Sequence, residues 1–163
     1  MHIEVLDKID ISTVLEEAND IKVMLKKGWK DIDQVGLQGH KPDLNWKDEW
    51  TRSIGSSKKD FPETYFKYPL WDTPTINRLI DKYGMVRTRI MSSAPKTNLT
   101  FHNDLTKRIH IPIISNPDCI MIIEDKIYHL EPGYVYLTNT TLRHTAVNAS
   151  WQQRVHIVGC MYS

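Results

Sequence analysis

The sequence has few cysteines, no excess of either charge and no long apolar run. Only two of its 163 residues are cysteine, and neither lies in a CxxC motif, so the chain can form one disulfide at most and a reducing cytoplasm is the simpler location. Lys and Arg number 21 against 20 Asp and Glu, which leaves no basic field to attract nucleic acid or an anionic membrane. The longest aliphatic run lies near residues 119–123 and is far too short to span a bilayer, and residues 1–10 lack the basic and apolar regions of a signal peptide. We therefore expect a cytoplasmic protein without a nucleic-acid or membrane partner.

The residues that are present describe an ordinary globular protein. Hydrophobic residues make up 40% of the chain and charged residues 25%, a composition that excludes a disordered or collagen-like chain. The length is that of one domain, and no internal repeat is visible. Because the pattern changes near residue 84, we predict a single domain, 1–163, in which residues 1–84 form a helical and irregular support and residues 85–163 form a β core.

Two helices are predicted in the N-terminal half. The first follows a capping box at Thr13–Glu16 and runs toward Gly28, with its apolar residues at helical spacing. The second begins at Thr73–Pro74, with Thr as the N-cap and Pro at the first helical position, and ends at Gly84. Short strands are expected at residues 2–6 and 34–38.

Residues 39–72 are charged and aromatic, contain three prolines, and are predicted to form a long surface excursion. Their aromatic side chains could form a lid over a substrate, or they could be buried to keep an irregular segment attached to the core. We favour attachment over a lid. The aromatic residues concerned are Trp46, Trp50, Tyr65, Phe66, Tyr68 and Trp71.

From residue 85 onward the pattern predicts short β-strands. Polar and apolar residues alternate at 85–91, 108–113 and 154–158, a further strand is expected at 99–102, and turn signals recur between them. Glu131-Pro132-Gly133 fits a type II turn, with Gly at the position that needs a positive φ. Many short strands in so short a segment predict a mainly β fold, an antiparallel sandwich or jelly roll.

Four residues of this half form a candidate metal and anion site. His102 and Asp104 are two positions apart and share a face if the strand continues to that point. His144 follows a later turn, and Arg154 lies on another alternating strand. An H-x-D pair alone often arises by chance, but the second histidine and the arginine make the set far more specific.

Two imidazoles and one carboxylate on one face of a metal leave three coordination positions open, the arrangement associated with non-haem Fe(II) oxygenases. A guanidinium deeper in the same barrel suits the far carboxylate of a dicarboxylate such as 2-oxoglutarate, through a bidentate pair that lysine cannot reproduce. The alternation of the last strand sets Arg154 beside His156 and opposite Val155 and Ile157. That pattern fits a strand with one face toward a polar interior.

These residues lie within a series of motifs that resembles a known family. The series R-x-R-I-M, H-N-D, R-I-H-I-P-I, L-x-P-G-Y-V-Y-L-T-N, H-T-A-V-N and R-V-H-I-V is similar to the aspartyl/asparaginyl β-hydroxylase branch of the Fe(II)/2-oxoglutarate-dependent oxygenases, which includes free-proline hydroxylases. The similarity covers roughly the C-terminal half. It implies a double-stranded β-helix, which is a cupin-like jelly roll, with iron held by His102, Asp104 and His144 and the C5 carboxylate of 2-oxoglutarate on Arg154.

The resemblance also implies that Arg108 and His110 face the pocket near the co-substrate and the substrate. Two positions depart from the family's pattern. Residues 92–96 replace the usual Pro-Gly turn before the first ligand, and Gly159 stands where Asp is common. Neither departure touches a predicted ligand.

We therefore predict an Fe(II)/2-oxoglutarate-dependent dioxygenase that uses O₂ to hydroxylate its substrate. The substrate is expected to carry a carboxylate, as a free or peptidyl amino acid, because Arg89 or Arg108 would be costly inside a barrel without an anion. Arg87 and Arg89 could instead pair with acidic residues of the 39–72 segment. Two alternatives stay open: a cupin-type metal enzyme with the same His/Asp/His set, which would not need Arg154, and a non-catalytic jelly roll that binds a small acid.

Overall fold

The computed structural model describes residues 1–54 and 62–162 and is mainly β. The part of the predicted surface excursion at residues 55–61 lies outside the described residues. The strands are β1 (Ile3–Lys8), β2 (Gln34–Gly36), β3 (Gln38–Gly39), β4 (Tyr68–Pro69), β5 (Met85–Ser93), β6 (Thr97–Asn98), β7 (Lys107–Ile114), β8 (Cys119–Ile123), β9 (Lys126–Tyr128), β10 (Tyr134–Thr138), β11 (His144–Asn148) and β12 (Arg154–Met161).

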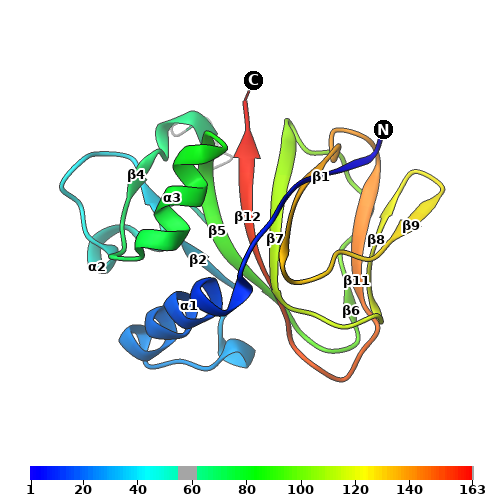
Figure 1. The fold of residues 1–163 in the computed structure, drawn as a ribbon, viewed down its shortest axis with the longest axis horizontal. Coiled ribbons are helices and arrows are strands. Elements are labelled where there is room, and N and C mark those ends of the chain that lie inside the picture. Colours follow the sequence, from blue (N-terminus) through cyan, green and yellow to red (C-terminus); the bar gives the residue numbers. More distant parts are fainter. Residues whose placement is uncertain (55–61, 163) are drawn as a thin grey trace.

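Most of these strands form two antiparallel sheets that face each other (Figure 1). The larger sheet has the order β1-β10-β7-β12-β5-β2, and the smaller has the order β6-β11-β8-β9. From β5 onward the chain passes repeatedly from the larger sheet to the smaller one and back, as β5 to β6, β7 to β8 and β10 to β11. This is the winding of a double-stranded β-helix, and it confirms the predicted jelly roll.

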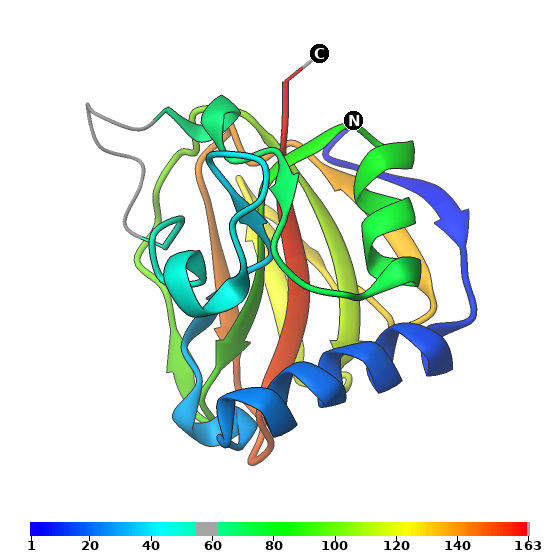
Figure 2. The same cartoon turned by 90° about the vertical axis from the view of Figure 1, so that its left-hand side faces the viewer.

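The N-terminal half supplies helices and also two strands of the larger sheet. Its helices are α1 (Ile11–Leu25), α2 (Trp46–Glu49) and α3 (Pro74–Lys82), with short 3₁₀ turns η1 (Trp29–Asp31) and η2 (Glu63–Tyr65). Strands β1 and β2 form the two edges of the larger sheet, and α1 and α3 cover the face turned away from the smaller sheet (Figures 1 and 2). No helix in the described ranges has both the length and the apolar character needed to cross a membrane.

The helix starts show one wrong prediction and one confirmed one. Helix α1 begins at Ile11, and its N-cap is Asp10, whose carboxylate accepts the N–H of Ser12 at 3.0 Å, so the predicted capping box at Thr13–Glu16 is wrong. Helix α3 begins at Pro74 after Thr73, as predicted. The Glu17 carboxylate of α1 accepts two N–H groups in the first turn of α3, each at 2.9 Å, and so satisfies donors that lack a partner within the helix.

Strand β12 divides its side chains between two environments. Val155 and Ile157 are fully buried in the apolar core that α1 and α3 form with the larger sheet. Arg154, His156 and Val158 alternate with them and therefore point to the opposite face, toward the smaller sheet. Figure 2 shows β12, in red, at the centre of the larger sheet behind the helices. One strand thus contributes to the core on one side and to the space between the sheets on the other.

Aromatic residues attach the described parts of the 39–72 segment to the core. Phe66 and Trp71 are buried, and the Trp71 indole N–H donates to the carbonyl of Gly36 at 2.8 Å. Trp46 stacks on Trp71 with ring centroids 4.9 Å apart. These contacts favour the attachment interpretation for these three side chains.

The segment 99–102, predicted as a strand, has only an isolated bridge between His102 and His144. Leu99 donates its N–H to the carbonyl of Ala146, and His102 and His144 exchange backbone hydrogen bonds of 3.0 and 2.9 Å. Between these contacts, the His102 side chain forms a hydrogen bond with the Thr100 carbonyl. This carbonyl therefore bonds a nearby side chain and not the backbone of a neighbouring strand. The bridge fixes the two histidines beside each other.

Candidate metal centre and its cavity

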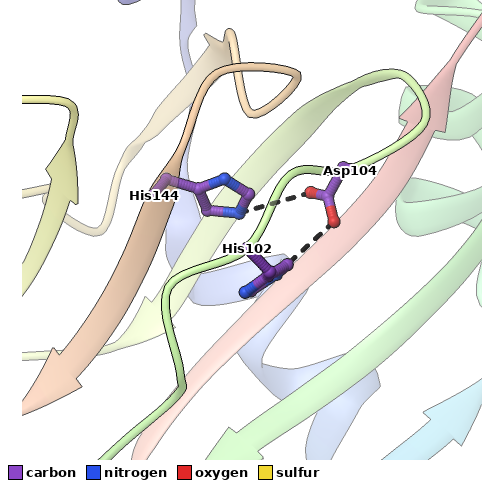
Figure 3. Close-up of side chains that lie close together, drawn as sticks. All are labelled: His102, Asp104 and His144. Carbon is purple, nitrogen blue, oxygen red and sulfur yellow. Dashed lines mark ion pairs between the residues drawn. The ribbon is translucent and has the colours of Figure 1, made fainter.

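Three side chains that sequence analysis selected as metal ligands lie together. Donor atoms of His102, Asp104 and His144 all lie within 4.8 Å of one another. The Nε2 atoms of the two histidines lie 3.5 Å from the two carboxylate oxygens of Asp104, one each (Figure 3). His144 comes from the start of β11, and the other two come from the irregular segment that leads into β7.

Backbone carbonyls orient both imidazoles of this cluster. Nδ1 of His102 lies 2.7 Å from the carbonyl of Thr100, and Nδ1 of His144 lies 2.9 Å from that of Leu142. Each Nδ1 must therefore carry the proton, which leaves the Nε2 lone pair directed at the cluster. Burial lowers the pKa of His144 and so favours its neutral form, the form that binds metals. Two neutral imidazoles and a carboxylate fit a divalent metal ion such as Fe(II).

The cluster opens into a cavity of about 770 Å³ between the two sheets. The wall contains every residue that the sequence analysis selected as a ligand, cofactor or substrate residue. These residues are Arg89, His102, Asp104, Arg108, His110, His144 and Arg154. The strand alternation therefore placed the polar faces of β5, β7 and β12 on the correct side of the larger sheet.

Arg154 is a buried cation in the cavity wall. Its Nη2 donates to the Ser93 hydroxyl at 3.0 Å, and its Nη1 lies 3.1 Å from Nδ1 of His156. Burial lowers its pKa to about 10, so the guanidinium stays charged at neutral pH. Within residues 1–54 and 62–162, no carboxylate forms an ion pair with it.

His110 lies beside Arg154 and is neutral. Burial, and after it the charges of Arg154 and Arg108, lowers the pKa of His110 to about 3. Its Nδ1 lies 3.1 Å from Nδ1 of His156, whose own pKa burial also lowers. The two imidazoles thus form an uncharged polar patch next to the Arg154 guanidinium.

The arginines on the other side of the cavity share a carboxylate that sequence analysis missed. Glu63, at the start of η2, accepts a bond of 2.8 Å from Arg87 Nη1 and one of 3.0 Å from Arg108 Nη2. Arg108 also directs its Nε at Asp104, 3.5 Å away. Pairing with an acidic residue of the 39–72 segment was the alternative left open for Arg87, and the structure shows that pairing. No local pattern marks Glu63, because its partners lie far along the sequence.

Arg89 has a different environment. It is 7% exposed, and its Nη1 donates to the Gln34 side-chain carbonyl at 2.7 Å. Burial, and after it the charge of Arg87, lowers its pKa to about 10. No carboxylate of the described residues lies within ion-pair distance of it. Arg89 and Arg154 are therefore the two cations in the described cavity wall without an ion-pair partner.

Gly159, one of the two departures from the family's pattern, has a packing explanation. A Cβ added at this residue would lie 2.3 Å from the terminal methyl of Met85 and 3.0 Å from the Thr88 hydroxyl. The side chains of β5 occupy the space that a larger residue would need. An aspartate at this position would require β5 to repack.

The sequence profile described as aspartyl/asparaginyl β-hydroxylase matches residues 10–161. The chain belongs to this family. The match extends well beyond the C-terminal motifs that first suggested it, and it includes both long helices and the segment that supplies Glu63. Membership of this family supports a hydroxylase-type function for the chain.

Several solved structures are similar to this family member over part of their length. A cupin domain from Bordetella pertussis Tohama I is 14% identical, with a TM-score of 0.41 over 47% of this chain and 80% of that one. A cupin superfamily protein from Desulfitobacterium hafniense is 9% identical, with a TM-score of 0.39 over 47% and 66%. An oxidoreductase of the 2OG-Fe(II) oxygenase family from Burkholderia pseudomallei is 15% identical, with a TM-score of 0.44 over 56% of each chain. No curated protein matches the sequence significantly.

Proposed function

We propose that the chain is an Fe(II)/2-oxoglutarate-dependent dioxygenase that hydroxylates a carboxylate-bearing substrate, a free or peptidyl amino acid. The observation that carries the proposal is the position of Arg154, a buried cation without a carboxylate partner among the described residues, in the same cavity as the His/Asp/His cluster. A metal site with such a cation nearby suits a co-substrate that has a chelating end and a distant carboxylate. Membership of a hydroxylase family supports the same chemistry.

His102, Asp104 and His144 would hold the iron. The carbonyls that bond the two Nδ1 atoms fix the ring orientation, so the donor atoms converge before any metal arrives. Asp104 is held in addition by Arg108, which limits its rotation. These three residues would hold the metal, and small ligands would reach it from the cavity.

Arg154 would bind the far carboxylate of 2-oxoglutarate. The Ser93 hydroxyl and the His156 ring hold the guanidinium from two sides, so it is already oriented for a bidentate pair. His110, kept neutral by burial, would supply an uncharged hydrogen-bonding group beside it. A charged histidine next to Arg154 would instead add an uncompensated positive charge.

Arg89 would bind the carboxylate of the substrate. It is the other cavity cation without an ion-pair partner among the described residues, and a buried guanidinium without an anion is costly. A carboxylate bound there would orient the neighbouring carbons of an amino acid toward the metal site. Arg108 remains a second candidate contact, although its guanidinium already pairs with Glu63.

The chain itself contributes orientation and exclusion of water. When bound, iron and 2-oxoglutarate supply the oxidising chemistry, in which O₂ is consumed and 2-oxoglutarate becomes succinate and CO₂. Met91, Met121 and Val158 line the same cavity and keep part of its wall apolar. Such a wall limits the water that can compete for the open coordination positions.

We also propose a cytoplasmic location. Cys119 and Cys160 are both buried free thiols, which suits a reducing compartment. Oxidation state measured by thiol labelling of the protein from cells tests this proposal, because a disulfide-linked or otherwise oxidised pair would contradict it.

The test of the proposed activity is succinate formation from 2-oxoglutarate in air with Fe(II), during incubation with a panel of free amino acids and peptides. We expect succinate together with a product that has gained one oxygen atom. A protein that binds metal and transforms a substrate without 2-oxoglutarate would be a cupin-type enzyme of another kind. Binding of small acids without turnover would identify a binding module. The His102→Ala/His144→Ala double variant serves as the inactive control.

A further inference from the structure

Glu63 is a buried anion built into the wall of the proposed substrate cavity. Its side chain is 4% exposed, and both carboxylate oxygens are engaged. In addition to Arg87 and Arg108, the Tyr162 hydroxyl donates to it at 2.8 Å and the Cys160 thiol at 3.2 Å. Burial would raise the pKa of Glu63, but Arg108 and these hydrogen bonds hold it below its ordinary value. The carboxylate is therefore ionised at neutral pH.

Of the four arginines in the described cavity wall, two form ion pairs with Glu63 and two do not. Arg87 and Arg108 direct their terminal nitrogens at Glu63, at distances of 2.8 and 3.0 Å. Arg89 and Arg154 have no such partner among residues 1–54 and 62–162. If Arg154 binds the co-substrate, a single unpaired guanidinium remains for the substrate.

We propose that Glu63 is a specificity-determining residue that restricts the cavity to substrates with one carboxylate and rejects those with a second anionic group. This inference rests on the proposed function and deepens it. Glu63 occupies the two guanidinium groups that a second carboxylate would need. An additional anion near them would face the carboxylate of Glu63, and Arg87 and Arg108 would have to give up their bonds to Glu63 in order to bind it.

An apolar part of the cavity wall is suited to an uncharged substrate body. Leu99, Leu105, Met121, Ala146 and Val158 line the cavity. Leu99 and Leu105 are 49% and 78% exposed, so the opening is partly apolar. Apolar contacts of this kind bind a neutral side chain and give no compensation to a second charge.

The experiment compares matched amino acids that differ by one negative charge. L-glutamine with L-glutamate, and L-asparagine with L-aspartate, are titrated calorimetrically and anaerobically into the protein loaded with Fe(II) and 2-oxoglutarate. In the wild type we expect each amide to bind at least about tenfold more tightly than its acid, a difference of about 1.4 kcal/mol. Equal affinities, tighter binding of the acids, or no binding of any of the four would overturn the proposal.

Glu63→Gln keeps the size of the side chain and removes its charge. We expect the preference for the amides to fall to about one or to reverse, because Arg87 and Arg108 become available to a second carboxylate. The double variant Glu63→Gln/Arg87→Gln has the same net charge as the wild type but leaves Arg108 without its Glu63 partner, and we expect its preference to lie between those of the wild type and the single variant. The matched control is Glu49→Gln, a buried glutamate outside the cavity wall that pairs with Arg52 and His40.

A merely structural role for Glu63 predicts a different result. The affinities of all four amino acids would then fall together, the ratio within each pair would stay constant, and the double variant would resemble the single one. That outcome overturns the inference while leaving the proposed function in place. A wild-type protein that binds neither iron nor 2-oxoglutarate would instead remove the proposed function, and this inference with it. If Glu63→Gln does not fold, the ratios of amide to acid affinity in the wild-type protein still test the proposal.

Discussion

Replacement of Arg154 by lysine tests the proposed binding of 2-oxoglutarate in the cavity. The substitution keeps a positive charge at the end of a long side chain, so the net charge of the cavity is unchanged. It removes the planar fork that Ser93 and His156 hold in place at 3.0 and 3.1 Å. The variant therefore separates the geometry of the guanidinium from its charge.

The expected loss follows from the bonds that the fork can form. A guanidinium donates two parallel hydrogen bonds to a carboxylate, whereas an ammonium at one point can align one of them. A hydrogen bond to a charged group contributes about 1.5–3 kcal/mol, which corresponds to a ten- to hundredfold change. We expect the apparent KM for 2-oxoglutarate to rise by about this factor in Arg154→Lys. Iron affinity should be nearly unchanged, because Arg154 is not part of the donor cluster.

Succinate formation measured over a range of 2-oxoglutarate concentrations provides the assay, and anaerobic Fe(II) titration provides the second readout. Arg78→Lys, an exposed position on α3, is the matched control and should behave as the wild type. An unaltered KM for 2-oxoglutarate in Arg154→Lys would show that another group binds the carboxylate, and the argument from the unpaired cation would be wrong. A parallel loss of iron affinity would point to a general disturbance of the fold.

Three further predictions concern the metal, the pH dependence and the helices. His102→Ala/His144→Ala should abolish Fe(II) binding, because a lone carboxylate competes poorly with water, and Asp104→Ala should weaken it less; unchanged titration curves would exclude this site. Burial lowers the pKa of His110 from 6.5 to about 3, so below pH 6.5 the unfolded chain binds a proton that the folded chain does not. Between pH 6.5 and about 3, the free energy of unfolding should fall with decreasing pH by about 1.4 kcal/mol per unit from this residue, and urea titrations of His110→Gln should lack that component. Glu17→Ala should lower the free energy of unfolding by about 1–2 kcal/mol, measured with urea, through loss of the cap on α3; a change within error would contradict the capping role.

Patterns with a fixed period were predicted well from the sequence. The alternation of β12 assigned Arg154 to the cavity face and Val155 and Ile157 to the core face, and the structure has them there. The start of α3 at Thr73–Pro74 was also correct. In both cases local backbone geometry determines the outcome. The period of 2 along a strand determines which face a side chain points to, and the fixed φ of proline favours a helix start.

Long-range polar contacts could not be predicted in the same way. Glu63 reaches Arg87 and Arg108 from an irregular segment, and nothing in the residues next to it indicates those partners. Likewise Glu17 replaces local residues as the cap of α3, a contact that depends on how two helices pack. In the segment 99–102, which was expected to be a strand, side chains bond two of the backbone carbonyls: His102 bonds that of Thr100, and Thr145 bonds that of Leu99. Tertiary proximity decides the contacts of Glu63 and Glu17, and periodicity contains no information about it.

The two-sided character of β12 means that stability and ligand preference can change independently. Substitutions at Val155 and Ile157 alter the contact with the helices, whereas substitutions at Arg154 and Val158, which line the cavity, alter what the cavity accepts. In a saturation library of this strand, protein abundance should depend mainly on the core-facing positions 155 and 157. Ligand binding should depend mainly on the alternating positions that face the cavity. A protein organised in this way can acquire new ligands through a few substitutions on the cavity face of β12, while the residues on its core face preserve the fold.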